Sequence, residues 1–421
     1  MRLLIISHVL PWPGEAGQQL RVRYALAAAV RKFQVDFLTF APAGKRKEVE
    51  DQLAALGCRP IVLTSRQTDS PLSRLRFMLG ASLFALCTGM KSSNYVIGRV
   101  ELSPSRIRSA VKPWEYSAVL YEYFHAVDSV PVFQSAGVPS ILDMHNVLWK
   151  SREERLKESV AWPAWIKRVS LTRYRRREES AWDQFDALIA INRREHDMVH
   201  ARKRPDQKLF YAPMGTDLSR WPYCWQPATP PRLAYYGGLA SAHNEAAALR
   251  CYECIMPLIW RRFPDTELWL VGSNPTQRLR NLTSDHRVKV TGFVAEVQHL
   301  LKTMSLVLCP WTGTYGFRSR IVEVMALGVS VVAPPAAVDG MELESGRGII
   351  LANSDQALAE QSLGLLSAPK QLELQSRLAR SEMERLYGLE ITYGRLMKEL
   401  REWVNTRSQA QSEKRLCDPD L

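Results

Sequence analysis

The sequence predicts an α/β protein built from two doubly wound domains, each with a parallel sheet between layers of helices. Three observations support this class. The chain has 421 residues, and single cores stop growing near about 250–300 residues, so two domains are expected. Short apolar runs alternate with helical patterns through the first half of the chain. The same alternation restarts in the second half, after a proline-rich segment at 217–232.

Apolar runs in each half have the length and composition of buried parallel strands. In the first half they are Leu3–Ser7, Val35–Phe40, Pro60–Leu63, Ala118–Tyr121, Ser140–Asp143 and Ala187–Ile191. In the second half they are Leu233–Tyr236, Leu268–Val271, Val288–Thr291, Leu306–Pro310, Val329–Ala333 and Gly348–Leu351. Helical patterns separate several runs. In the helix predicted at Gln18–Lys32 the residues that recur on one side are Leu20, Tyr24, Ala27 and Val30.

The segment 217–232 contains four prolines and is predicted to be a stiff linker. The first domain then covers residues 1–216 and the second covers residues 233–370. Residues 371–404 are predicted to be helical, and residues 405–421 to be a disordered tail.

The composition is typical of a globular protein, with 46% hydrophobic and 24% charged residues. The net charge of +13 indicates an anionic partner, such as nucleic acid, lipid headgroups or an anionic substrate. The seven cysteines follow no disulfide framework, which favours a reducing compartment. Cys251 and Cys254 form an isolated pair in a helical pattern, and we interpret both as core or surface residues.

Neither a secretory signal nor a membrane span is predicted. The apolar run at 2–8 is too short for a signal and is interpreted as the first strand. Phe77–Met90 is also too short to span a bilayer. We expect it to be buried or to line a cleft, with a position on a membrane surface as the alternative.

The segment Arg168–Arg177 is rich in arginine and follows Lys167. Arg173, Arg176 and Arg177 share a face at helical spacing, and such a face can meet anionic lipid. The alternative is a solvated helix whose charge is offset by the two glutamates that follow, Glu178 and Glu179.

The most informative stretch is Gly313–Gly328, which lies between two predicted strands. It is predicted to form a glycine loop and a helix that stops at Gly328. Backbone N–H groups at such a helix start bind anions, and Arg318 and Arg320 add positive charge there, so a diphosphate is the expected guest. Glu323 is placed to accept hydrogen bonds from a ribose diol. Alternatively, both arginines are solvated and Glu323 pairs with one of them.

The stretch Gly316–Gly328 resembles the donor-binding helix of retaining glycosyltransferases of family four (glycosyl transferases group 1), closest to bacterial sugar transferases of the exopolysaccharide type. Three further blocks agree in order: Tyr235–Gly238, Pro264–Gly272 and Val290–Val294. The resemblance covers about residues 230–355. Tyr315 stands where the family usually carries the first of two glutamates spaced eight apart.

The resemblance implies the GT-B architecture, in which two Rossmann-like domains face each other across a cleft. It also implies that the nucleotide sugar binds the second domain and the acceptor the first, and that the C-terminal helices cross back to the first domain. The implied donor-binding residues are Gly237, Gly238, Gly272, Phe293, Gly316, Phe317, Arg318, Arg320 and Glu323. The implied acceptor-binding residues, in loops that follow predicted strands, are Gly17, Glu122, Asp143 and Asn146.

These residues together predict a retaining hexosyltransferase that acts on a saccharide or lipid-linked acceptor in cell-surface polysaccharide synthesis, from a UDP- or GDP-linked sugar. No cofactor and no metal are expected, because Arg318, Arg320 and the helix dipole can stabilise the leaving diphosphate. His145 and His125 are candidates for proton transfer. We expect a cytoplasmic protein, peripheral at the inner face of the cell membrane.

Two alternatives come from other classes. A nucleotide-sugar epimerase would share the fold but needs further carboxylates. A nucleic-acid-binding protein would explain only the positive charge, because no nucleic-acid recognition motif accompanies it.

Overall fold

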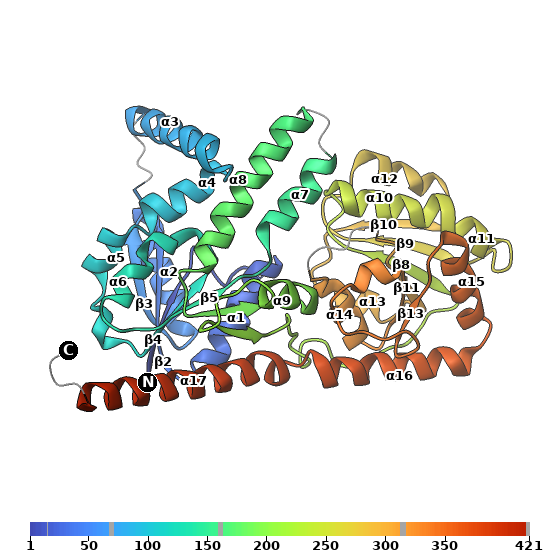
Figure 1. Cartoon of the computed structure of the whole chain (residues 1–421). Helices are drawn as coiled ribbons and strands as arrows, with labels where there is room; N and C mark the ends of the chain where they lie inside the picture. The colour runs from blue at the N-terminus through green and yellow to red at the C-terminus, as the bar shows by residue number, and fades with distance from the viewer. Residues whose placement is uncertain (15, 67–70, 159–162, 312–316, 418–421) are drawn as a thin grey trace. The chain divides into compact units, whose positions relative to one another are not determined.

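The computed structural model describes residues 1–14, 16–66, 71–158, 163–311 and 317–417 (Figure 1). The chain divides into two compact units. The first unit comprises Met1–Pro213 with Tyr393–Leu421, and the second unit comprises Met214–Thr392. Each unit contains one parallel sheet, so the α/β class and the two Rossmann-like domains are confirmed.

The sheet of the first unit has the order β3-β2-β1-β4-β5-β6-β7, with all pairs parallel among the described residues. Its strands are β1 (Arg2–Ile6), β2 (Gln34–Ala41), β3 (Arg59–Thr64), β4 (Ala118–Glu122), β5 (Ser140–Asp143), β6 (Ala187–Ala190) and β7 (Lys208–Tyr211). The strand order reverses between β1 and β4, and ligands bind beyond the carboxyl ends of the strands at such a switch point. The edge strand β7 was not predicted, because its run is short and half-buried.

Helices cover this sheet and connect its strands. They are α1 (Gly17–Ala29), α2 (Arg46–Ala55), α3 (Pro71–Thr88), α4 (Ser92–Tyr95), α5 (Pro104–Ala110), α6 (Val130–Gln134), α7 (Leu148–Glu158), α8 (Ala164–Trp182), α9 (Arg193–His200) and α17 (Arg395–Cys417). Short 3-10 or π segments are η1 (Ala43–Lys45), η2 (Val96–Glu101), η3 (Pro113–Glu115) and η4 (Phe124–Ser129). Figure 1 shows α3 standing away from the sheet beside α4 and α8.

The sheet of the second unit has the order β10-β9-β8-β11-β12-β13 and is also parallel. Its strands are β8 (Arg232–Tyr236), β9 (Glu267–Val271), β10 (Val288–Gly292), β11 (Leu306–Leu308), β12 (Ser330–Ala333) and β13 (Ile349–Leu351). The switch point lies between β8 and β11. Successive residues of β11 point to opposite faces, so Leu306 and Leu308 pack in one core and Val307 in another.

Two helical layers complete these cores. The helices are α10 (Ala242–Arg250), α11 (Met256–Trp260), α12 (Gln277–Asn281), α13 (Val297–Leu301), α14 (Ser319–Ala326), α15 (Asp355–Leu366) and α16 (Pro369–Leu386). Short segments are η5 (Cys251–Ile255), η6 (Leu282–Ser284), η7 (Pro335–Val338) and η8 (Glu390–Gly394). As predicted, α14 ends just before Gly328, whose φ is +88°. A Cβ there would come within 2.4 Å of the Tyr223 ring, so the position requires glycine.

The segment predicted as a linker packs on the second unit. Trp221 is buried, and its carbonyl accepts a hydrogen bond from Arg380 of α16 at 2.7 Å. The Trp225 indole N–H donates to the carbonyl of Met304 at 2.9 Å. The two tryptophans in the segment supply enough apolar area for this packing, which the proline count alone did not indicate.

The C-terminal residues divide between the two units. The helix α16 belongs to the second unit, and α17 belongs to the first unit. There Trp403 packs against Phe210, and Arg407 pairs with Asp186 at 2.8 Å. The helix α17 continues to Cys417, past residue 404, where the sequence analysis ended it. Residues 405–417 contain no Gly or Pro to stop a helix, so the tail prediction began too early.

Two other helices differ from expectation. In α1 the buried side includes Arg21, whereas Ala27, predicted on the apolar side, is exposed. The run Phe77–Met90 lies mostly in α3, and only Ala81 of that helix is buried. The prediction of a buried or cleft-lining helix is therefore wrong. No helix among the described residues is both long and apolar enough to cross a membrane.

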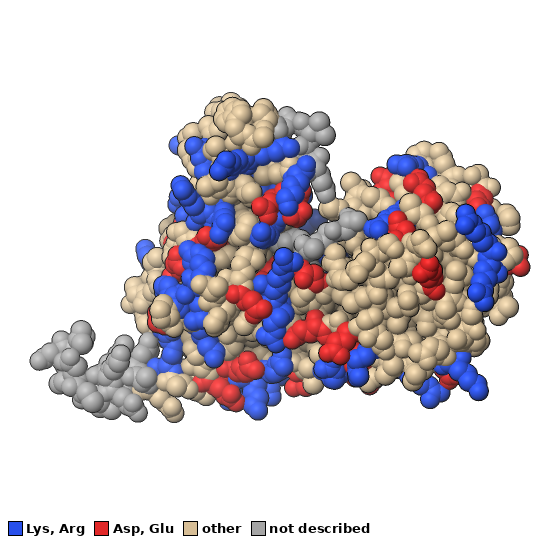
Figure 2. All heavy atoms as spheres, turned by 45° about the vertical axis from the view of Figure 1, so that its right-hand side comes forward, with Lys and Arg blue, Asp and Glu red and all other residues tan. Residues whose placement is uncertain are grey.

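Charge is distributed unevenly over the molecule. Figure 2 shows Lys and Arg side chains spread over one face of the first unit, including its upper part, where Figure 1 places α3 and α8. Several arginines of α8 have partners. Arg175 pairs with Glu179 at 2.7 Å, and Arg177 pairs with Asp128 at 3.0 Å. Glu178 is buried and does not offset the surface charge.

Candidate functional site

The second unit places α14 beside its switch point. The helix follows β11, at the carboxyl end of the sheet, and Arg318 is the residue just before its first turn. Gly316 and Tyr315 lie outside the described residues. The helix axis directs its N-terminal partial positive charge toward the strand ends, which is where an anionic ligand of an open α/β sheet binds.

Arg320 and Glu323 meet on α14, as their spacing predicted. The Arg320 guanidinium donates to Glu323 Oε2 at 2.7 Å and to the Tyr236 hydroxyl oxygen at 2.8 Å. Tyr236 in turn donates to Glu323 Oε2 at 3.0 Å. Burial alone would lower the pKa of Arg320, but the Glu323 carboxylate raises it above its ordinary value. Glu323 therefore pairs with an arginine, which is the arrangement of the alternative interpretation.

Arg318 lies against an aromatic ring. Its guanidinium carbon is 4.1 Å from the centroid of Trp311. The indole N–H of Trp311 donates to Tyr235 at 3.0 Å, and Tyr235 donates to Asn244 at 2.8 Å. Burial lowers the pKa of Arg318. A partly desolvated cation on a rigid aromatic support is held where a phosphate oxygen can reach it.

The glycines predicted at the donor site lie in two loops that pack against each other. Gly237 N–H donates to the Val271 carbonyl at 3.0 Å, and Leu239 N–H donates to the Ser273 carbonyl at 3.0 Å. A Cβ on Gly272 would lie 1.6 Å from the carbonyl oxygen of Gly237. Only glycine permits this approach. The Asn244 side chain donates to the carbonyl of Gly238 at 2.7 Å, and Gly237 is buried beside it.

Two predicted donor residues are the phenylalanines Phe293 and Phe317. Phe293 follows the edge strand β10 and is 68% exposed. Phe317 packs its ring against Tyr387, at 5.6 Å between centroids. The structure therefore assigns Phe317 a packing contact, and places Phe293 on the surface without a described partner ring.

The first unit has a charged cluster at the ends of β4 and β5. Arg21 of α1 donates to both carboxylate oxygens of Asp143, at 2.8–2.9 Å, and to the carbonyl of Ala212 at 3.1 Å. Arg21 and Asp143 are buried. Burial would lower the pKa of Arg21, but Asp143 raises it above its ordinary value. The pair therefore fixes α1 to the sheet as a buried ion pair.

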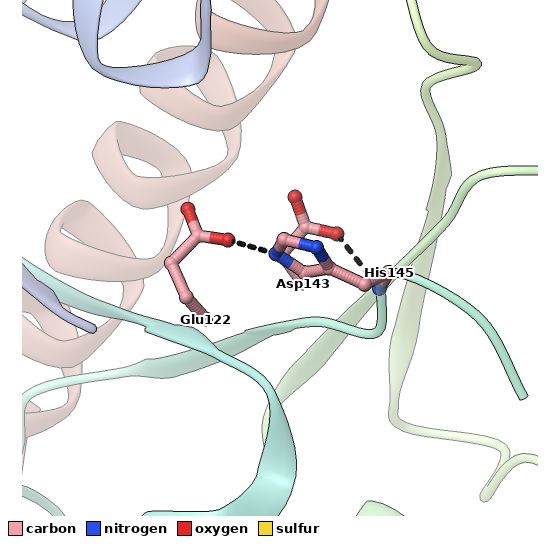
Figure 3. Close-up of side chains that lie close together, drawn as sticks. All are labelled: Glu122, Asp143 and His145. Carbon is pink, nitrogen blue, oxygen red and sulfur yellow. Dashed lines mark hydrogen bonds and ion pairs between the residues drawn. The ribbon is translucent and has the colours of Figure 1, made fainter. Parts of the chain in front are cut away.

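His145 joins this cluster through Glu122. Its Nε2 lies 2.5 Å from Glu122 Oε2, and its backbone N–H donates to Asp143 at 3.3 Å. Figure 3 shows both contacts. Burial and the negative charge of Asp143 raise the pKa of Glu122. His145 has a φ of +56°, which costs energy in a non-glycine residue and is typical of functional sites.

Aromatic rings surround His145. The ring of Tyr123 stacks on it at 4.0 Å between centroids, and Tyr123 also has a positive φ, of +73°. His125 stacks on the other side of Tyr123 at 5.4 Å. His8, directly after β1, lies 5.1 Å from His125. Rings from β1, β4 and β5 thus converge at the switch point of the first unit.

The histidines differ in their protonation. Burial, with the nearby His145, lowers the pKa of His8 to about 4. Burial, with His8 and His145, lowers the pKa of His125 well below its usual value. Both rings are therefore neutral at pH 7. The two ring nitrogens of His125 are buried and make no hydrogen bond to any described residue.

The remaining acceptor candidates lie near this cluster in sequence. Asn146 follows His145, and its side-chain oxygen is buried without a hydrogen-bond partner among the described residues. Gly17 is exposed at the first position of α1. Glu178 of α8 accepts hydrogen bonds from the backbone of Leu148 at 2.8 Å and Trp149 at 2.6 Å. Glu178 thereby anchors the start of α7, which follows the His145 loop.

Glu122, Asp143 and His145 have the residue types and spacing of a metal site. However, both oxygens of Asp143 already accept from Arg21. A cation bound there would face this buried guanidinium, which would repel it. The cluster fits an internally neutralised network better than a metal site.

Comparison with known proteins identifies the class of the chain. Residues 230–368 match the sequence profile of the family described as glycosyl transferases group 1. The match shows that this segment of the chain resembles the group 1 glycosyltransferases. The resemblance stated from the sequence is thus confirmed. The search of curated protein sequences found no match to this chain.

Several solved structures share its fold. Sucrose-phosphate synthase from Thermosynechococcus elongatus is 16% identical, with a TM-score of 0.65, over 96% of this chain and 100% of that one. Anabaena HepE in complex with UDP and glucose is 15% identical, with a TM-score of 0.60, over 96% and 100%. The lipopolysaccharide outer core galactosyltransferase WaaB is 13% identical, with a TM-score of 0.59, over 97% and 100%. At these identities the likeness establishes the fold.

Four site residues of the glycosyltransferase escaped the sequence analysis. They are His8, Arg21, Tyr123 and Tyr236. Tyr236 ends a predicted strand, and His8 and Tyr123 lie within two residues of the end of one, so the strand-end rule could have included them. Arg21 had no such signal, because a charged residue in an amphipathic helix is usually solvent-exposed.

Proposed function

We propose that this glycosyltransferase moves a hexose from a UDP- or GDP-linked sugar to a saccharide or lipid-linked acceptor, with retention of the anomeric configuration. The observation that carries the proposal is the start of α14, where two partly exposed arginines and a buried glutamate lie at one switch point. The family match of residues 230–368 covers this segment.

We assign the diphosphate to Arg318, Arg320 and the first N–H groups of α14. The bond between the anomeric carbon and the diphosphate oxygen breaks during transfer, and negative charge develops on that oxygen. Fixed cations and a helix N-terminus stabilise this charge without a metal ion. We assign the ribose diol to Glu323, which exchanges Arg320 for the two hydroxyl groups when the nucleotide binds.

We assign the backbone of Gly237, Gly238 and Gly272 to the donor as well. Side chains would block the close approach of a phosphate or base to these loops. HepE, which has the same fold, is known in complex with UDP-glucose, and this supports a uridine nucleotide as the first donor to test.

In the first unit we assign acceptor binding to the polar side chains around His145. The Glu122 carboxylate orients the imidazole through Nε2, as carboxylates do in histidine bases. We therefore assign proton transfer to His145. His125, whose pKa is depressed, is a weaker base, and its ring nitrogens have no hydrogen-bond partner among the described residues, so we assign it a hydrogen bond to substrate.

The test is release of UDP or GDP from a panel of UDP- and GDP-hexoses, with and without saccharide and lipid-linked acceptors, and without added metal. We expect one donor to be used in preference and release to rise with an acceptor. The anomeric configuration of the product, read by NMR, checks retention. Release of neither nucleotide with any donor would contradict the proposal.

A further inference from the structure

The helix α3 exposes a row of large apolar side chains. They are Leu72 (81% exposed), Leu75 (56%), Met78 (67%), Leu79 (65%), Leu83 (63%) and Leu86 (69%). They recur every three or four residues and therefore share one face of the helix. An apolar face of this extent is rare on a monomeric soluble protein and marks an interaction site.

The opposite face of α3 is packed, so the outward direction of the leucines is fixed. Phe84 packs against Tyr95 of α4, at 5.1 Å between ring centroids. A Cβ on Gly80 would lie 3.0 Å from the Tyr95 hydroxyl. The carbonyl of Leu86 accepts a hydrogen bond from Arg173 of α8 at 2.7 Å. The helix is thus held against α4 and α8 while its leucine face points to solvent.

The neighbouring helix α8 continues this surface. Trp165 is 69% exposed and Val169 is 42% exposed. Arg168 and Arg176 fall on the same side of α8 by helical spacing, and both are exposed. The sequence of α3 itself contains Arg74 and Arg76 but no Asp or Glu. Exposed apolar side chains and arginines thus occur together on both helices.

We infer that the exposed leucine row of α3, with Trp165 and Val169 of α8, is a membrane-binding surface whose occupant is an anionic bilayer. The leucines would lie in the acyl boundary, the tryptophan at the headgroup level, and the arginines on lipid phosphates. An α-helix of 18 residues is about 27 Å long and can lie flat along such an interface.

Charge favours a bilayer over a second copy of the chain. A symmetric dimer through α3 would place the arginines of one copy near those of the other, and like charges at an interface are unfavourable. Anionic headgroups provide the opposite charge on every side of the apolar row. This inference rests on the proposed function in one respect. Of the two acceptors proposed, a saccharide and a lipid-linked molecule, it selects the lipid-linked one.

The experiment is flotation of the full chain with vesicles of phosphatidylglycerol and phosphatidylcholine, or of phosphatidylcholine alone, at low and high salt. The test variant carries Leu79→Glu and Leu83→Glu. The matched control carries Trp114→Glu and Leu374→Glu, which are also exposed apolar residues (71% and 48%) but lie in η3 and α16. All four positions are exposed, so thermal melting should stay near that of the unmodified protein.

We expect the unmodified chain and the control variant to float with anionic vesicles at low salt. The α3 variant should partition at least about tenfold more weakly, because two apolar anchors become charged. Equal flotation of the two variants, or no flotation of the unmodified chain, would overturn the inference. A lipid-free dimer that only the α3 variant dissociates, seen by sedimentation, would assign the surface to a second copy instead.

Titration of the same samples with UDP and GDP separates the two proposals. Vesicle binding without nucleotide binding would leave the membrane surface intact and contradict the proposed transfer. Nucleotide release by a chain that does not float with vesicles would support the proposed transfer and contradict the membrane surface.

Discussion

Arg320 pairs with Glu323 at 2.7 Å. In the proposed function, a bound nucleotide divides this ion pair, because Arg320 then contacts the diphosphate and Glu323 the ribose. The pair is only partly exposed, with Arg320 at 42% and Glu323 at 5% side-chain exposure. A charge-assisted hydrogen bond of this kind is easily exchanged for another of similar strength. The ion pair therefore positions both groups before the donor binds.

The two arginines can be tested by substitution. Arg318→Ala or Arg320→Ala should lower the transfer rate by about a hundredfold or more, which is the scale of losing one preorganised group that stabilises developing charge. Arg377→Ala, on the surface of α16 and paired with Glu373, is the control and should leave the rate unchanged. Steady-state rates with the preferred donor are the measurement. Full activity in both site variants would remove them from the mechanism.

Glu195 provides a prediction for pH. It is buried in α9, and burial raises its pKa to about 8. An unfolded glutamate ionises near 4.5, so between these values the unfolded state loses its proton and the native state keeps it. The contribution of protonated Glu195 to the free energy of unfolding is therefore fully present below pH 4.5, the pKa in the unfolded state, and is lost as pH rises toward 8.

The substitution Glu195→Gln cannot ionise and should remove this loss. Relative to the unmodified chain, its stability should increase between pH 5 and 8, by up to about 1.4 kcal/mol per pH unit. Urea denaturation at pH 5, 6.5 and 8 measures the difference, with Glu48→Gln on the exposed side of α2 as control. A difference that is independent of pH would show that Glu195 is ionised in the native state.

At the scale of elements, the loops that follow β8 and β9 contain Gly237 and Gly272. The backbones of these loops approach each other so closely that position 272 requires glycine. Gly272→Ala would force the β9 loop away from Gly237 and should cost about 1–3 kcal/mol or more. In contrast, Gly238→Ala has no atom nearer than 4.0 Å and should change stability by less than about 0.5 kcal/mol. Thermal melting of the two variants gives the comparison. Equal melting temperatures would contradict the close approach of the loops.

Elements were predictable where a local pattern determines them. The strands of both sheets and the end of α14 at Gly328 followed from apolar runs and turn residues. The short edge strand β7 did not, because edge strands have no continuous apolar run. The exposure of the apolar face of α3 also could not be predicted, because an apolar helix has the same sequence pattern whether it packs on protein or on lipid.

At the scale of the molecule, the family resemblance and the strand order together predict where ligands bind. The sequence analysis placed candidate residues at strand ends, and the structure brings Glu122, Asp143 and His145 together there. The sequence analysis did not predict Arg21 as a partner of these residues. Long-range pairs such as Arg21 with Asp143, 122 positions apart, depend on tertiary packing that no local pattern encodes.

The arginines of α8 do not form the uniformly cationic face that the sequence suggested. Part of the arginine content of α8 is used in pairs with Asp128 and Glu179. The arginines that border the apolar row of α3 are few, so we expect vesicle binding to weaken with salt but not to vanish, because the leucines contribute independently of salt.

The central claim is that the α14 start of the second unit binds a nucleoside diphosphate, and isothermal titration with UDP and GDP tests it most directly. The unmodified chain should bind one of the two nucleotides. Glu323→Gln should weaken that binding by about 1.5–3 kcal/mol, the scale of a hydrogen bond to a charged group, whereas Glu373→Gln on α16 should not. Absence of binding by either nucleotide, or equal affinity in the Glu323→Gln variant, would contradict the account.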